Sequence, residues 1–84
     1  MYVVYVIQSE RDKRLYKGFT NDLEKRIKEH NSKKTASTKA YTPWVLVYFE
    51  EVTDRTAARE REKYLKSGIG REYLKKIGSI SITV

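Results

Sequence analysis

After Met1 the chain reads YVVYVI, residues Tyr2–Ile7, and it continues after a polar, turn-like segment with RLYKGFT, residues Arg14–Thr20. β-Branched and aromatic residues dominate both stretches, which is typical of β-strands. The first stretch is apolar throughout and predicts a strand that is covered on both faces, at Tyr2–Ser9. The second stretch predicts its antiparallel partner, so the chain is expected to begin with a β-hairpin.

Successive side chains of a strand point to opposite faces of the sheet. In the second strand this alternation places Leu15, Lys17 and Phe19 on one face, and Tyr16 and Gly18 on the other. Gly18 has no side chain, and it would leave an open place beside Tyr16 where the backbone of a ligand could approach. A bulge or a twist of the strand is an equally simple interpretation of the same glycine.

Capping residues and changes of periodicity predict the remaining elements. Together they indicate one α/β (α+β) domain, residues 1–84, in which helices flank a three-stranded antiparallel sheet. Gly68 is expected to stop the second helix. The predicted elements are a helix at Asp22–Asn31, a polar basic loop at 32–42, a third strand at Trp44–Glu51, and helices at Arg55–Ser67 and Gly70–Ile77.

Length and composition limit the class of protein. The 84 residues suffice for one domain with a modest core, and the absence of cysteine excludes disulfides and thiolate metal sites. The apolar run at Tyr2–Ile7 is too short for a signal-peptide core or a membrane span. A cytoplasmic protein with no membrane partner is therefore expected. The β-prone tail, residues 79–84, stands alone and is expected either to be frayed and disordered or to pair weakly on a sheet edge.

The charge balance points to a polyanionic partner. The chain has 18 lysines and arginines against 11 acidic residues, a net charge of +7. Cations near phosphates release counterions, so a nucleic acid is the partner that this balance favours. A lysine-rich surface that only keeps the protein in solution is the alternative. The lysines expected to contact the phosphate backbone are Lys17, Lys25, Lys28, Lys33, Lys34 and Lys39.

Two basic residues of the first predicted helix lie beside its apolar stripe. Leu23 and Ile27 form that stripe, and Arg26 and His30 flank it, one turn apart. Other charged residues already supply the solvated face, so Arg26 either extends past the core or reaches into a cleft. A lone helix histidine such as His30 is more often a surface or half-buried residue than a ligand.

A carboxylate interrupts the inward stripe of the second predicted helix. Ala58, Glu62 and Leu65 fall at positions i, i+4 and i+7, which places Glu62 between two core-facing residues. A buried carboxylate is costly unless it is paired, hydrogen-bonded or bound to a cation. The simpler interpretation is an ion pair with a neighbouring basic residue, namely Arg26, Arg61 or Lys66.

The order of these residues resembles the GIY-YIG nuclease domain in its small stand-alone form. That family has a tyrosine in each of two strands, a helix arginine and a later helix glutamate, matched here by Tyr5, Tyr16, Arg26 and Glu62. The segment AREREKYLK at residues 58–66 is similar to the family pattern Ala-x-x-x-Glu-x-x-x-Lys. By themselves, strand tyrosines are usually packing residues.

The resemblance runs from Tyr2 to about Lys76, with two departures. Val3 and Val4 replace the glycine and isoleucine of the first name motif, and Lys17 replaces the isoleucine of the second. The valines preserve strand character, so the resemblance in fold is unaffected.

The resemblance implies an endonuclease that hydrolyses phosphodiester bonds in nucleic acid, DNA rather than RNA, with Mg²⁺ or Mn²⁺. Mg²⁺ keeps several waters, so a single protein carboxylate can hold it. An arginine can grip a phosphate oxygen pair bidentately. Tyrosine, with a pKa of about 10, is a poor base unless it is assisted, and either tyrosine could be that base. The implied catalytic residues are Tyr5, Tyr16, Arg26, His30 and Glu62, with Glu62 on the metal and Lys66 as a further candidate.

Two other functions fit the same residues. A nucleic-acid-binding module on this fold could have lost turnover, and a basic protein-interaction domain is a third reading. Family members with known targets usually carry additional DNA-recognition domains, and none is apparent in these 84 residues. Low or structure-selective specificity is therefore expected, or specificity that a partner protein supplies.

Overall fold

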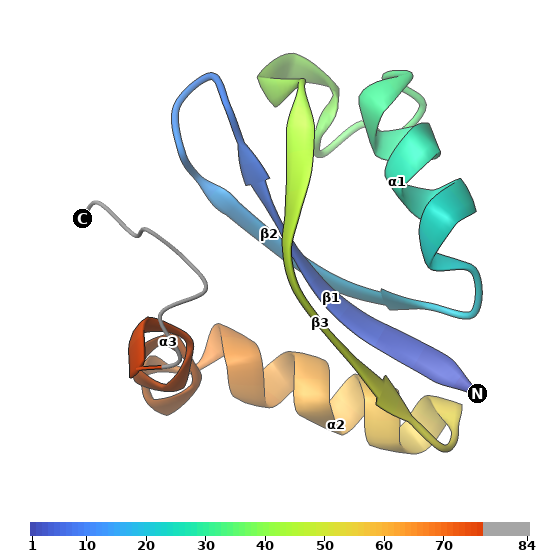
Figure 1. Ribbon diagram of the computed structural model, residues 1–84, viewed down its shortest axis with the longest axis vertical. Helices are drawn as coiled ribbons and strands as arrows, with labels where there is room; N and C mark the ends of the chain where they lie inside the picture. Colours follow the sequence, from blue (N-terminus) through green and yellow to red (C-terminus); the bar gives the residue numbers. More distant parts are fainter. Residues whose placement is uncertain (77–84) are drawn as a thin grey trace.

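The computed structural model describes residues 1–76, so the prediction of a disordered tail at 79–84 lies outside the described residues. Strands and helices follow in the predicted order (Figure 1). None of the helices in the described part is long and apolar enough to cross a membrane. The elements are β1 (Tyr2–Ser9), β2 (Leu15–Thr20), α1 (Leu23–Asn31), the 3₁₀ turn η1 (Lys39–Tyr41), β3 (Trp44–Val52), α2 (Arg55–Lys66) and α3 (Gly68–Lys76).

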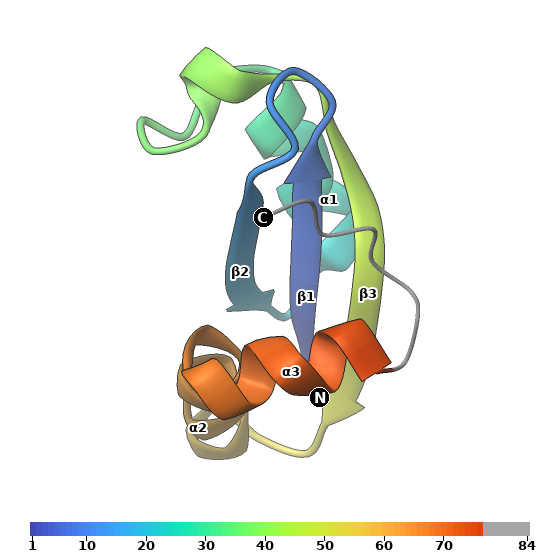
Figure 2. The same ribbon diagram turned by 90° about the vertical axis from the view of Figure 1, so that its left-hand side faces the viewer.

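The sheet has the strand order β2-β1-β3, and both pairs are antiparallel. Tyr5 of the central strand is opposite Gly18 on one side and Phe49 on the other. Helix α1 covers one face of the sheet, and α2 and α3 cover the other (Figures 1 and 2). The predicted fold class, a three-stranded antiparallel sheet flanked by helices, is confirmed.

Alternation along β1 divides the core into two clusters. Val4 and Val6 point to the α2–α3 face and pack against Ala58, while Tyr5 and Ile7 point to the α1 face. All four side chains are at most 1 % exposed. Burial of side chains of this size contributes about 1.5–3 kcal/mol each. The tyrosine expected at the site is therefore also a core residue of the α1 face.

Most boundaries agree with the sequence patterns to within a residue. Asp22 precedes α1 as its N-cap, and its carboxylate accepts a hydrogen bond of 3.2 Å from the Lys25 backbone N–H. Asp54 caps α2 in the same way, through the Ala57 N–H at 2.8 Å. These bonds satisfy N–H groups that have no partner within the helix. The predicted loop at 32–42 includes one short regular piece, the turn η1.

The expected roles of the glycines after α2 are wrong. Gly68 was predicted to stop the second helix and Gly70 to open the third, but α3 already begins at Gly68. Ser67 explains the difference because it serves both helices. Its N–H and its hydroxyl both donate to the Tyr64 carbonyl, and the hydroxyl accepts from the Gly70 N–H at 3.2 Å. One residue thus ends α2 and caps α3.

Candidate active site

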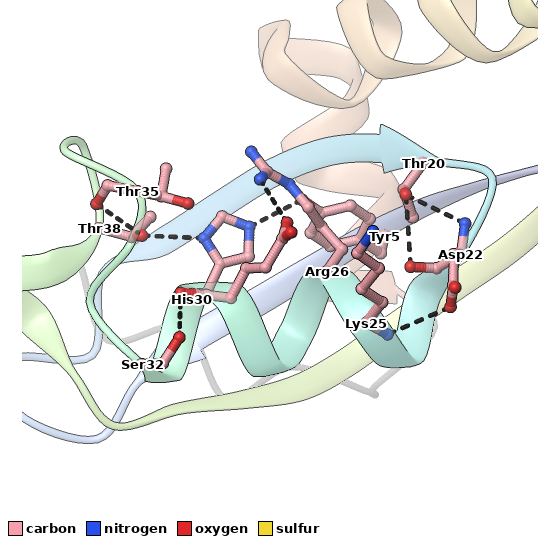
Figure 3. Close-up of polar contacts among 10 residues, drawn as sticks. Tyr5, Thr20, Asp22, Lys25, Arg26, His30, Ser32, Thr35 and Thr38 are labelled. Carbon is pink, nitrogen blue, oxygen red and sulfur yellow. Dashed lines mark hydrogen bonds and ion pairs between the residues drawn. The ribbon is translucent and has the colours of Figure 1, made fainter.

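Tyr5 lies at the centre of the candidate site. It projects from the central strand toward α1, is 1 % exposed, and its hydroxyl lies 2.9 Å from Nε2 of His30 (Figure 3). Burial raises the pKa of Tyr5 to about 12, although the nearby Arg26 guanidinium opposes this shift. Tyr5 is therefore a neutral phenol at neutral pH.

His30, in the last turn of α1, is fully buried and held from both ring nitrogens. Its Nδ1 lies 2.8 Å from Oγ1 of Thr38, and that hydroxyl donates to the Thr35 carbonyl at 3.4 Å. Because the Thr38 hydroxyl has one proton, Nδ1–H is assigned as the donor and Nε2 accepts from Tyr5. Burial, with a smaller effect from the charge of Arg26, lowers the pKa of His30 to about 4. The result is a directional chain of neutral groups.

Tyr16 of β2 completes an aromatic group around this imidazole. Its ring lies 4.9 Å from that of His30 and 6.4 Å from that of Tyr5, between centroids. Tyr16 is half-buried, and within the described residues its hydroxyl forms no hydrogen bond. The two predicted tyrosines therefore differ: the phenol of Tyr5 is engaged and enclosed, and that of Tyr16 is available.

Gly18 does not provide the open place that its sequence context suggested. A Cβ added there would lie 2.8 Å from the Tyr5 hydroxyl oxygen and 3.2 Å from Cε1 of Tyr16. The phenol of Tyr5 thus occupies the space above the glycine, and the strand pairing is regular there. The ligand approach and the bulge are therefore wrong, and the twist of the strand stays an untested interpretation. Gly18 makes room for the tyrosine of the neighbouring strand.

Arg26 brings positive charge to the site from α1. Its guanidinium donates to the Glu29 carboxylate at 3.0 Å, and its side chain is 32 % exposed. The hydrogen bond to Glu29 is the main cause of the raised pKa of Arg26, and Tyr5 and Tyr16 raise it further. The guanidinium therefore lies near both phenols. Arg26 also lines a cleft of about 240 Å³ between the end of β2 and α1. Glu29 orients the arginine and leaves other N–H donors for a substrate.

Glu62 approaches the same region from α2. Its side chain is 18 % exposed and its carboxylate lies 3.5 Å from Lys66 Nζ, so the ion pair of the simpler interpretation is formed with Lys66. Arg61 instead pairs with Glu50 at 2.9 Å. Negative charge on Glu62 contributes to the raised pKa of Tyr5, which places it in electrostatic reach of the tyrosine.

The donor set around Glu62 limits what metal it could hold. No group of three or more acidic, histidine or cysteine residues that could bind a metal occurs within residues 1–76. One carboxylate fits a hard cation such as Mg²⁺, which keeps most of its ligands as water and substrate oxygens. The buried His30 uses both ring nitrogens in hydrogen bonds and is not available as a ligand.

Sequence reasoning missed the residues that support His30. The Asn31 side chain bonds to the first residue of β3. Its amide N–H donates to the Trp44 carbonyl at 3.0 Å, and its amide oxygen accepts from the Trp44 backbone N–H at 2.6 Å. The Trp44 indole N–H donates to the Thr38 carbonyl at 2.9 Å. Thr38 is fully buried although it comes from a polar loop without periodicity. No local signal in the sequence marks it, because its role depends on contacts with α1 and β3.

The six predicted lysines fall into two groups. Five lie on α1 and the segment that follows it. The hydrogen bond from Arg26 is the main cause of the lowered pKa of Glu29, and the charges of Lys25 and Lys34 lower it further. Lys28 is exposed and pairs with Glu24 at 3.6 Å. Lys17 is separate, because alternation in β2 turns it to the α2–α3 face. The α1 group consists of Lys25, Lys28, Lys33, Lys34 and Lys39.

Comparison with known proteins identifies the family of the chain. The family model described as the GIY-YIG catalytic domain matches residues 1–74. A UPF0213 protein of Clostridium perfringens is 42 % identical over 98 % of this chain and 88 % of its own length. A UPF0213 protein of Haloquadratum walsbyi is 42 % identical over 79 % of this chain and 74 % of its own.

A solved structure also resembles this one. The solution NMR structure of a UPF0213 protein from Bacillus halodurans aligns with a TM-score of 0.56 and 29 % identity, over 94 % of this chain and 87 % of that chain. Both the sequence match and the fold match thus extend over nearly the whole chain. The chain belongs to the GIY-YIG domain family, among the small UPF0213 proteins.

Proposed function

We propose that this protein is a metal-dependent endonuclease that hydrolyses phosphodiester bonds, with DNA as the preferred substrate. The observation that carries the proposal is the meeting of two phenols, an imidazole and a guanidinium from three elements, with the Glu62 carboxylate in electrostatic reach. A family whose members act on nucleic acid supports the substrate class. The excess of basic residues supports it further.

Tyr16 is the tyrosine that we assign to the attacking water. Its hydroxyl has no partner among the described residues, whereas the Tyr5 hydroxyl is committed to His30. Oxygen of the water bonds to phosphorus as the bond from phosphorus to the leaving oxygen breaks, and Tyr16 accepts the proton of that water. The phenol passes its own proton to solvent before the attack, and the leaving oxygen takes a proton from solvent as it departs.

Arg26 and Glu62 supply the electrostatic part of the proposal. A guanidinium can bind two non-bridging phosphate oxygens and stabilise the charge that builds on them in the transition state. Glu62 would hold Mg²⁺ or Mn²⁺, which supplies positive charge to the phosphate and to the departing oxygen when it is bound. Tyr5 and His30 position these groups, because their buried hydrogen bonds fix the α1 face of the sheet.

The decisive test compares wild type with Glu62→Ala on plasmid DNA, branched DNA and RNA, with Mg²⁺ or with EDTA. We expect nicking by the wild type only, and only with metal. Nucleic-acid binding by Glu62→Ala should remain, because the change removes a metal ligand and no phosphate contact. Arg26→Ala should lose both turnover and some affinity. Equal nicking by both proteins would mean a contaminating nuclease or a different site.

A catalytically silent binding module on the same fold is the second candidate. The ion pair of Glu62 with Lys66 at 3.5 Å favours it, because a carboxylate that already has a cation partner does not require a metal. Salt-dependent binding with no nicking on any substrate, by wild type and variant alike, would put this reading ahead. A partner protein that supplies specificity is compatible with either candidate.

A further inference from the structure

A second basic region, separate from the α1 lysines, lies at the edge of the sheet that β2 forms. An open cleft of about 400 Å³ is formed where β2, the end of α2 and the start of α3 meet. Three cationic side chains from these three elements enter it, and no acidic residue is among those that line it. We call it the basic notch, and its lining residues are Leu15, Tyr16, Lys17, Lys66 and Arg71.

The charges of the basic notch are not balanced within the described residues. Neither Lys17 nor Arg71 forms an ion pair there, and Lys66 keeps only its contact of 3.5 Å with Glu62. Burial lowers the pKa of Lys17, and the charges of Arg71 and Lys66 lower it further. Like charges held together in a partly desolvated cleft oppose folding unless an anion offsets them.

The notch adjoins the candidate active site. Tyr16 lines the notch and also places its ring 4.9 Å from that of His30. Lys66, which lines the notch too, is the ion-pair partner of Glu62. A polyanion bound across the site could therefore continue directly into the notch.

We propose that the basic notch binds a backbone phosphate of the nucleic acid, next to the phosphate at the candidate active site. The inference deepens the proposed function and rests on it. Arg71 can present a planar pair of donors to two phosphate oxygens, and Lys17 and Lys66 add point charges. Such contacts place the strand in register and carry no sequence information. The notch thus fixes the direction in which the strand crosses β2.

The test compares the double variant Lys17→Gln/Arg71→Gln with a control of equal charge, Lys63→Gln/Lys76→Gln. Both control lysines are exposed and lie outside the notch and the site. Affinity for a labelled duplex is measured by fluorescence anisotropy in EDTA, over about 0.05–0.3 M salt. The slope of log affinity against log salt should become shallower by about one for the notch variant, and by clearly less for the control.

A charge-preserving variant separates binding from folding. Lys17→Arg/Arg71→Lys should keep most of the wild-type slope, because both cations remain in the cleft. Circular dichroism and thermal melting confirm that each variant is folded. Equal slopes for the notch and control variants would overturn the proposal, as would wild-type protein that binds no nucleic acid. Because EDTA blocks metal-dependent cleavage, these results do not depend on whether the protein is a nuclease.

A final arm distinguishes nucleic acid from free phosphate. Inorganic phosphate is titrated at constant ionic strength while the amide NMR signals of Lys17 and Arg71 are followed. We expect no saturable shift, since one small anion lacks the neighbouring contacts of a strand. Saturable phosphate binding at these residues, with an unchanged salt slope for DNA, would identify a free-phosphate site and overturn the assignment.

Discussion

The hydroxyl of Tyr5 lies 2.9 Å from Nε2 of His30, and both side chains are at most 1 % exposed. The pKa of the tyrosine is raised to about 12 and that of the histidine is lowered to about 4. Both groups are therefore neutral over the physiological range, and the contact is a hydrogen bond between uncharged partners. Burial thus gives this pair a structural role that depends on pH.

The first prediction concerns stability in acid. Unfolded His30 binds a proton near its ordinary pKa of 6.5, whereas the folded protein resists protonation down to about 4. The unfolded state binds more protons in this window, so stability falls as pH falls from 6.5 to 4, by at most about 3 kcal/mol. Urea denaturation at several pH values measures the loss. His30→Gln should lack this part of the pH dependence, and identical profiles would contradict the prediction.

A glycine series tests the close packing of Tyr5. Gly18→Ala should cost about 1–3 kcal/mol, because the new Cβ would lie 2.8 Å from the Tyr5 hydroxyl oxygen. Gly70→Ala should cost more, since its Cβ would collide with the backbone of Tyr64 and Leu65. Gly68→Ala is the matched control, because its Cβ meets no atom within 4 Å. In thermal melting, Gly70→Ala should lose the most stability, Gly18→Ala less and Gly68→Ala the least.

Thr38 offers a test of the assigned histidine tautomer. Thr38→Val keeps the shape but removes the acceptor of the His30 Nδ1–H, which should cost about 1–3 kcal/mol. Thr38→Ser restores the hydroxyl and should recover most of that loss. Nitrogen NMR of the imidazole should show the Nδ1–H tautomer in wild type and in the serine variant. A wild-type spectrum with the proton on Nε2 would reverse the direction of the hydrogen-bond chain.

The two tyrosines should respond differently to loss of the hydroxyl. The free energy of unfolding of Tyr16→Phe should stay within about 0.5 kcal/mol of the wild-type value, because the Tyr16 hydroxyl supports no other described group. The same variant should lose turnover, because the proposed base is removed. Tyr5→Phe should lose about 1–3 kcal/mol, since it leaves Nε2 of His30 buried without a donor. Denaturation and nicking assays on both variants give the comparison. The opposite pattern would make Tyr5 the base.

The α1 group of lysines should set affinity without setting sequence preference. Lys25→Gln/Lys34→Gln removes two charges beside Arg26 and Glu29, and should weaken binding to unrelated duplexes by similar factors. The salt slope should fall by about one to two. Anisotropy measurements on several duplexes provide the test. Salt-insensitive binding by the wild type would contradict the electrostatic account.

Regular elements were predictable because their signals are local. Alternation in β2 correctly placed Tyr16 on the other face of the sheet from Leu15 and Phe19, and Asp22 and Asp54 marked the starts of α1 and α2. Gly68 was misjudged because a glycine after a helix usually ends it, whereas here the Ser67 hydroxyl caps the next one. That outcome depends on the two hydrogen bonds of the Ser67 hydroxyl, which no pattern of residue types encodes.

The candidate site was predictable only in part. The resemblance supplied the set of catalytic candidates, and helical spacing turned Arg26 and His30 toward the sheet. The part played by Thr38 was not predictable, because it requires the 32–42 loop to fold back over α1. The sequence also did not predict that Arg71 and Lys17 line one cleft, since this depends on where α3 lies relative to β2.

Trp44 gives the protein a built-in optical reporter. It is the chain's single tryptophan, is 3 % exposed, donates its indole N–H to the Thr38 carbonyl, and lies 6.3 Å from the Tyr16 ring between centroids. Indole emission shifts to longer wavelength when water reaches the ring. Release of the loop that holds His30 should therefore appear as a red shift without any label. A red shift that precedes the loss of the far-ultraviolet circular dichroism signal would therefore report release of this loop before global unfolding.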